Sequence, residues 1–117
     1  MTYFITTLFT EPILFLRIVF ILIVSITLHE LAHGLAALSQ GDDTPDKSGH
    51  MTLNPVVHMG VPSIVFLCIA GIAWGAMPVN PSKFRWPRLG NAIVAAAGPL
   101  LNLTLGVLIL AGLMLAR

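Results

Sequence analysis

The chain has 117 residues, of which 56% are hydrophobic and 9% are charged. Soluble domains carry about 25% charged residues, so this composition excludes an ordinary soluble domain and favours an integral membrane protein, as does the mean hydropathy of +0.91. The formal net charge of +1 comes without a basic stripe, which excludes nucleic acid as a partner. The single cysteine, Cys68, excludes an internal disulfide and a cysteine-rich zinc site.

An apolar run at residues 13–38 predicts the first membrane helix. About 26 residues would extend ~39 Å at about 1.5 Å per residue, which exceeds the roughly 30 Å hydrocarbon core of a bilayer. A His-Glu-x-x-His motif, made by His29, Glu30 and His33, lies near the end of this run. A site built from these residues is therefore expected below one membrane surface and not at the midplane.

The motif has the spacing of a zinc site. On a helix, His29 and His33 are one turn apart on the same face, where both imidazoles can reach one cation. Glu30 points about 100° further around the helix, from where it can act on a metal-bound water without being a ligand. Two histidine ligands and a general base are the zinc-peptidase arrangement, so we predict Zn²⁺ as the cofactor.

The same three residues allow two other interpretations. They could be polar side chains that reach the membrane surface, but ionisable groups are costly in a span and usually mark a functional path. The two histidines could hold haem iron, but axial ligands approach a haem from opposite faces, which adjacent turns of one helix do not allow. The metal site remains the favoured interpretation.

The part of the chain after the first helix is polar. Asp42, Asp43 and Asp46 lie in a stretch typical of a solvated turn. Residues 50–55 then predict a short extended or β segment, which an Asn-Pro pair ends.

Residues 61–77 form a second apolar segment of about 17 residues, the lower limit for a span. It either crosses the bilayer or dips in and returns, and we favour re-entry because the segment is short and interrupted by Pro and Gly. The loop at residues 78–89 holds half of the six Lys and Arg residues, which makes it cytoplasmic by the positive-inside rule. Residues 90–116 predict a second long membrane helix.

These elements predict an all-α membrane protein that forms a single membrane-embedded unit over residues 1–117. It contains two long transmembrane helices, one short or re-entrant apolar segment, and a small extended or β segment after the first helix. The lipid bilayer is therefore an expected partner, while the pattern leaves the oligomeric state open.

Three stretches of the chain resemble the site-2 protease family of intramembrane zinc peptidases, and above all its compact prokaryotic branch. They are HELAHGLAALSQGD, GHMTLNPVVHM and PVNPSKFRWPRLGNAIVAAAGPLLNL. The resemblance covers roughly residues 28–103. It implies that His29 and His33 bind zinc, that Glu30 activates the water on the metal, and that Asn102 is a supporting polar residue in the neighbouring core helix.

The resemblance also implies where the substrate binds and what the protein does. Met51, Thr52, Leu53 and Asn54 would match an edge-like segment that holds substrate as an added strand. The implied activity is that of a zinc metalloendopeptidase of regulated intramembrane proteolysis, which cleaves transmembrane-helix substrates by metal-activated water. The implied location is a prokaryotic cell membrane, with the active site toward the cytoplasmic side. The rival of a different class is a truncated, non-catalytic membrane module that binds or shields another membrane protein.

The chain departs from the family at the third metal ligand. The family takes it from a later membrane helix, as an aspartate before glycine, and no such pair follows residue 102 in this sequence. Asp42 lies nine residues beyond His33, and a helix that continues to residue 38 would carry it away from the metal. We expect the chain to be a fragment of a longer protein, in preference to an inactive truncated relative or a ligand supplied by another chain.

Overall fold

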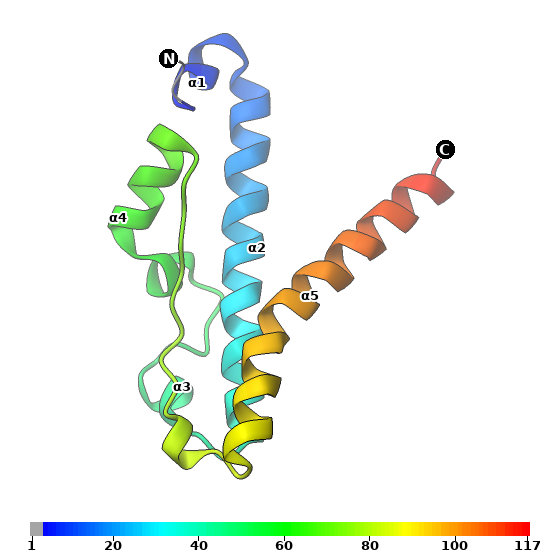
Figure 1. The fold of residues 1–117 in the computed structure, drawn as a ribbon. Helices are drawn as coiled ribbons and strands as arrows, with labels where there is room; N and C mark the ends of the chain where they lie inside the picture. The colour runs from blue at the N-terminus through cyan, green and yellow to red at the C-terminus, as the bar shows by residue number, and fades with distance from the viewer. Residues whose placement is uncertain (1–3) are drawn as a thin grey trace.

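The computed structural model describes residues 4–117. Its regular elements are all helical: α1 (Thr6–Thr10), α2 (Pro12–Ser39), α3 (Thr44–Lys47), α4 (Pro55–Ala70), the 3-10 helix η1 (Pro81–Lys83) and α5 (Pro87–Leu115). α5 packs against the second half of α2 and then leaves it at an angle, so that its C-terminal half stands free (Figure 1). The predicted all-α fold with two long apolar helices is confirmed.

Both long helices have the length and composition needed to cross a membrane. In the most apolar window of each, only 11% of the residues are buried inside the molecule, which is unlike the core helix of a soluble protein. Each helix has a proline in its first turn, where the missing N–H costs no hydrogen bond. α5 therefore begins at Pro87, slightly before the predicted start, and it continues through Pro99.

The short apolar segment forms a helix that begins earlier than predicted. The side chain of Asn54 caps α4 by accepting the N–H of Val56 at 3.0 Å. The helix is interrupted at Gly60, and it ends at Gly71, whose φ of 73° is the left-handed conformation that glycine adopts without strain. Residues 71–80, which we name the return segment, then run without regular secondary structure back along α2 toward η1 (Figure 1).

The return segment is tied to α4. The Ser63 hydroxyl donates to the carbonyl oxygen of Trp74 at 2.7 Å and accepts the N–H of the same residue at 2.9 Å. The N–H of Ala76 donates to the carbonyl oxygen of His58 at 2.9 Å. The segment thus enters and leaves at the same end of α2, which is the chain path of the re-entrant alternative.

The small extended or β segment predicted at residues 50–55 is not shown. Residues 51–53 form bends, and within residues 4–117 no strand occurs. Local hydrogen bonds explain the difference, because they occupy groups that a strand would offer to a partner. The Thr52 hydroxyl accepts the N–H of Asn54 at 3.2 Å, and the Thr52 carbonyl accepts the Nε2–H of His58 at 2.6 Å.

The prediction of a solvated turn is wrong for Asp42. Its side chain is fully buried at the end of α2 and accepts three hydrogen bonds: the N–H and hydroxyl of Thr44 at 3.0 and 2.6 Å, and the N–H of Asn80 at 2.6 Å. Burial raises the pKa of this carboxyl group, but the bonds from Thr44 and Asn80 outweigh burial, so its pKa lies below the usual 3.8. Asp42 therefore joins the first loop to the end of the return segment.

Asp43, in contrast, is partly exposed and forms ion pairs with Lys83 at 2.7 Å and with Lys47 at 2.9 Å. The hydrogen bond from Lys83, followed by that from Lys47, lowers the pKa of Asp43 to about 2. The N–H of Arg85 donates to the carbonyl oxygen of Gln40 at 2.7 Å. The loop after α2 and the loop before α5 are thus held together.

We expect Asp42→Asn to destabilise the fold by about 1–3 kcal/mol at pH 7, because an amide leaves a buried N–H without its acceptor. The measurement is thermal unfolding in detergent. Since the folded pKa is lowered, the carboxylate stabilises the fold above pH 3.8 and this contribution disappears as the pH falls through the folded value. The difference between wild type and variant should therefore shrink in acid. Asp46→Asn, at an exposed position, is the control, and equal melting of both variants would contradict the assignment.

Candidate metal centre

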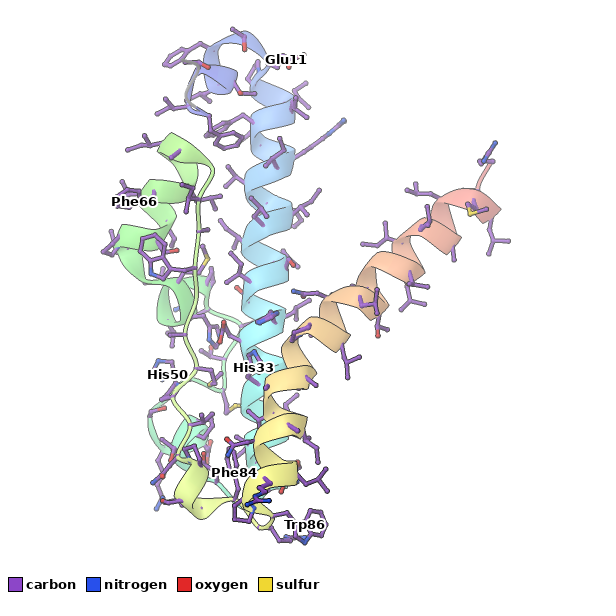
Figure 2. All side chains as sticks on the ribbon, in the orientation of Figure 1. Glu11, His33, His50, Phe66, Phe84 and Trp86 are labelled. Carbon is purple, nitrogen blue, oxygen red and sulfur yellow. The ribbon has the colours of Figure 1, made fainter. Side chains whose placement is uncertain are left out.

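The two histidines of the motif face each other on α2. The Nε2 atoms of His29 and His33 are 3.0 Å apart, and their rings meet edge to face with centroids 4.6 Å apart. Both side chains are half-buried, and Figure 2 shows His33 in the part of α2 against which α5 packs. The predicted pair is thus brought together with its Nε2 atoms converging.

Helix α5 holds the other nitrogen of each ring. His33 donates its Nδ1–H to the carbonyl oxygen of Val94. The Nδ1 atom of His29 lies 2.9 Å from the side-chain Nδ2 of Asn102. Metal-binding histidines in proteins usually donate the N–H of the ring nitrogen that does not bind the metal, as His33 does to Val94. Asn102 therefore lies where the resemblance implied a supporting polar residue.

Gly98 faces the space beside the two Nε2 atoms. A Cβ atom at this position would lie 2.6 Å from Nε2 of His29 and 2.6 Å from Nε2 of His33, which is too close for any real contact. Glycine at this position thus lets both imidazole rings lie directly against the backbone of α5. Two converging imidazole nitrogens are donors of the kind that zinc takes, and they supply two of the protein ligands of such a site.

Glu30 lies on another part of the helix surface, against the return segment. It is 9% exposed, and a Cβ atom at Gly75 would lie 2.9 Å from its Cγ and 3.3 Å from its Oε1. Gly75 therefore lets the return segment pass directly over the carboxylate. One turn further along α2, Gly34 lets the side chains of Met51 and Met77 lie against the helix, because a Cβ atom at this position would clash with both.

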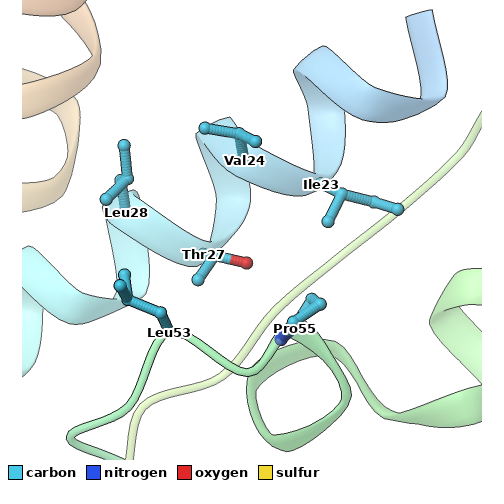
Figure 3. A pocket seen from close by; sticks show the side chains of 6 residues that line it. All are labelled: Ile23, Val24, Thr27, Leu28, Leu53 and Pro55. Carbon is cyan, nitrogen blue, oxygen red and sulfur yellow. The ribbon is translucent and has the colours of Figure 1, made fainter.

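The residues expected to bind substrate are distributed over the bend before α4. Met51 contacts α2 at Gly34, while Leu53 is 67% exposed. Leu53 also lines an apolar pocket of about 330 Å³ between this bend and α2 (Figure 3). The other residues around it are Ile23, Val24, Thr27, Leu28 and Pro55. Leu28 directly precedes His29 in sequence, but the pocket faces the bend before α4, whereas the ring of His29 contacts α5.

A third metal ligand is not found within residues 4–117, where no group of three or more His, Cys, Asp or Glu side chains could hold a metal ion. Asp42 is engaged with Thr44 and Asn80 beyond the end of α2. Sequence reasoning missed the close approach of Gly98 and Gly75. The approach of Gly98 could have been predicted, since Gly98 and Asn102 are four residues apart and hence on one face of a helix.

The fold and the site define a class: a helical protein with membrane-length apolar helices and a histidine pair of metal-ligand spacing. No family model and no solved structure matches the chain. The chain is 45% identical over 89 residues to "Putative zinc metalloprotease YwhC" of Bacillus subtilis, a match that covers 75% of this chain and 41% of the relative.

Two further matches are to proteins named "Putative zinc metalloprotease Rip2". The identity is 32% over 103 residues with that of Mycolicibacterium smegmatis (79% of this chain, 39% of the relative) and 30% over 95 residues with that of Mycobacterium tuberculosis H37Rv (76% and 36%). These matches confirm the resemblance to the site-2 protease family over the part that they cover. The chain spans less than half the length of the curated relatives it matches.

Proposed function

We propose that this chain forms the catalytic core of an intramembrane zinc metalloendopeptidase. The observation that carries the proposal is the convergence of the His29 and His33 Nε2 atoms, each ring being held at Nδ1 by α5. The relatives' names specify zinc and protease activity. When bound, zinc supplies a Lewis acid that lowers the pKa of water and polarises a carbonyl group.

The residues of the motif have separate roles in the proposed reaction. His29 and His33 hold the metal through Nε2. Glu30 acts as the general base: its carboxylate accepts a proton from the attacking water and later delivers it to the leaving amine nitrogen. Its place directly after His29 on α2, 9% exposed under the return segment, supports this role because bulk water is kept from the carboxylate.

The substrate class is a transmembrane protein whose helix unwinds at the cleavage site, since helical carbonyl groups are engaged and shielded. Met51, Thr52, Leu53 and Asn54 are proposed to bind the unwound chain beside α2. The apolar pocket that Leu53 lines offers room for an apolar side chain of the substrate. The return segment, which passes over Glu30, is proposed to offer further backbone groups to the unwound chain.

The location that we propose is a prokaryotic cell membrane, with the metal centre toward the cytoplasmic side. The Asp43–Lys83 ion pair and the Arg85–Gln40 hydrogen bond hold both polar loops at one end of the molecule. The basic residues of the second loop favour the cytoplasm for that end. The N-terminus then lies on the opposite side of the membrane.

Cysteine labelling tests this topology. In a Cys68→Ala background, Ser39→Cys and Ser82→Cys, both at exposed positions, are expected to react with a membrane-impermeant maleimide from the same, cytoplasmic side. The physical reason is that the two loops are in contact. Labelling from opposite sides of sealed vesicles would contradict the re-entrant path.

Zinc binding by the purified chain tests the proposed function itself. We expect weak binding, below one equivalent per chain after dialysis, because two imidazoles leave the other coordination positions of zinc to water or further ligands. His33→Ala should remove most of this binding, whereas His50→Ala, outside the site, should leave it unchanged. The proposal of a metal centre fails if both variants retain the zinc of the wild type.

A further inference from the structure

A basic stretch lies just before α5 and in its first turn, and it holds Lys83, Arg85 and Arg88. Lys83 is neutralised by its ion pair with Asp43. The two arginines are exposed, and within the described part of the chain their side chains form neither an ion pair nor a hydrogen bond. Asp46, the exposed acid of α3, is paired with neither of them. Two guanidinium groups at this end of the molecule therefore present their donors outward, where they can bind an anion.

Two large apolar side chains are next to the arginines in the chain. Trp86 is 53% exposed and Leu89 is 56% exposed, and Figure 2 shows Trp86 projecting from the end of the molecule where α5 begins. We name the four residues Arg85, Trp86, Arg88 and Leu89 the arginine–tryptophan patch. Tryptophan in membrane proteins lies by preference at the level of the lipid headgroups. The patch thus combines positive charge with apolar surface, which are the two properties of a site for an anionic amphiphile.

The backbone of the patch is held in place by the rest of the fold. The N–H of Arg85 donates to the carbonyl oxygen of Gln40 at 2.7 Å. Phe84, which precedes Arg85, is 5% exposed and packs with Ala37 of α2 and Val94 of α5. The arginine side chains therefore extend from an ordered backbone, which reduces the conformational entropy that binding would cost.

The start of α5 places the patch at the membrane surface. This helix has membrane length and begins at Pro87. Side chains in a helix are tilted toward its N-terminus, so Arg88, in the first turn, is directed toward the surface and away from the hydrocarbon core. The phosphate groups of lipids lie at this level. A guanidinium group matches them, because it donates two parallel hydrogen bonds to a phosphate.

We propose that the arginine–tryptophan patch binds the headgroup of an anionic phospholipid. Arg85 and Arg88 bind the phosphate, and they disfavour a zwitterionic headgroup because its ammonium group carries the same charge as theirs. Trp86 and Leu89 contact the glycerol and upper acyl region, which a soluble phosphate does not possess. The inference is independent of the proposed metal centre, because none of these four residues belongs to it.

The test measures which lipids are enriched around Trp86. The 117-residue chain with Trp74→Phe, in which Trp86 is the only tryptophan, is placed in phosphatidylcholine vesicles. These contain the same small fraction of either brominated phosphatidylglycerol or brominated phosphatidylcholine, and quenching of Trp86 fluorescence gives the relative affinity for the two lipids. We expect a preference of at least about fivefold for phosphatidylglycerol, the usual effect of one basic side chain near an anionic membrane surface. The preference should decrease at high salt, which screens exposed charges.

The double variant Arg85→Gln, Arg88→Gln is expected to lose the preference, and Arg88→Gln alone should lose part of it. Both variants should fold, because neither side chain has a partner in the described part of the chain and the N–H of Arg85 remains. Thermal unfolding in detergent checks this. The matched control is Arg17→Gln, at an exposed position near the start of α2, which should keep the preference of the wild type.

Three results would overturn the inference. The first is equal quenching by the two brominated lipids in the chain with both arginines. The second is a preference for phosphatidylglycerol that is unchanged in the double variant. The third is the same loss in Arg17→Gln, which would assign the preference to the net charge of the chain and not to the patch. Zinc binding should be the same in all of these variants, so failure of this test and failure of the metal centre are separate results.

Discussion

Glu30→Gln is expected to reduce cleavage of a transmembrane substrate by about 10²–10⁴-fold, the usual contribution of a general base. The experiment uses the complete reading frame that contains this chain, expressed in membranes together with a tagged single-span substrate. Glutamine keeps the shape of the side chain beneath Gly75 but cannot take a proton from water at neutral pH. Cleavage is followed as the rate at which the tagged fragment appears.

The matched control is Glu11→Gln, because Glu11 is the other glutamate of the chain and lies exposed before α2. It should cleave at the wild-type rate. Zinc content should be the same in both variants, which separates loss of the base from loss of the metal. If the Glu30 variant cleaves within twofold of the wild type while the protein is active, Glu30 is not the base.

Gly98→Ala is expected to weaken zinc binding by at least about tenfold, comparable to the loss of an outer partner of a metal-binding histidine. The new Cβ would lie 2.6 Å from Nε2 of both His29 and His33. The rings cannot turn aside freely, because Val94 and Asn102 of the same helix hold their Nδ1 atoms. The measurement is zinc affinity by competition with a chromophoric chelator.

Gly106→Ala is the matched control for this substitution. Gly106 is also in α5, and a Cβ there would meet nothing within 4 Å. Alanine is favoured over glycine in a helix by about 1 kcal/mol, so both variants should keep the helix. Only the Gly98 variant should lose zinc, and equal affinity in the two variants would show that the metal does not bind at the histidine pair beside Gly98.

The long helices were predictable because a membrane span appears in the sequence as one long apolar run. The helix predicted at residues 13–38 is α2 (Pro12–Ser39), and the helix predicted at residues 90–116 is α5 (Pro87–Leu115). The pairing of His29 with His33 followed from helix geometry alone, since residues four apart share a face. These features depend on neighbours in sequence.

The features that could not be predicted depend on segments far apart in the chain. Asp42 is buried where the end of the return segment packs against it and the N–H of Asn80 donates to its carboxylate. Glu30 contacts Gly75 because residues 71–80 run back along α2. These residues have no clear alternation of apolar and polar side chains from which that path could have been predicted. At residues 50–55, bonds between near neighbours such as Thr52 and Asn54 replaced the expected strand.

The most direct test of the metal centre is X-ray absorption at the zinc edge on the zinc-loaded protein. We expect two imidazole ligands with Zn–N distances of about 2.0–2.1 Å. The imidazole scattering should disappear in the His29→Ala, His33→Ala double variant, because these rings supply the converging Nε2 atoms. An imidazole signal that is unchanged in the double variant would contradict the account.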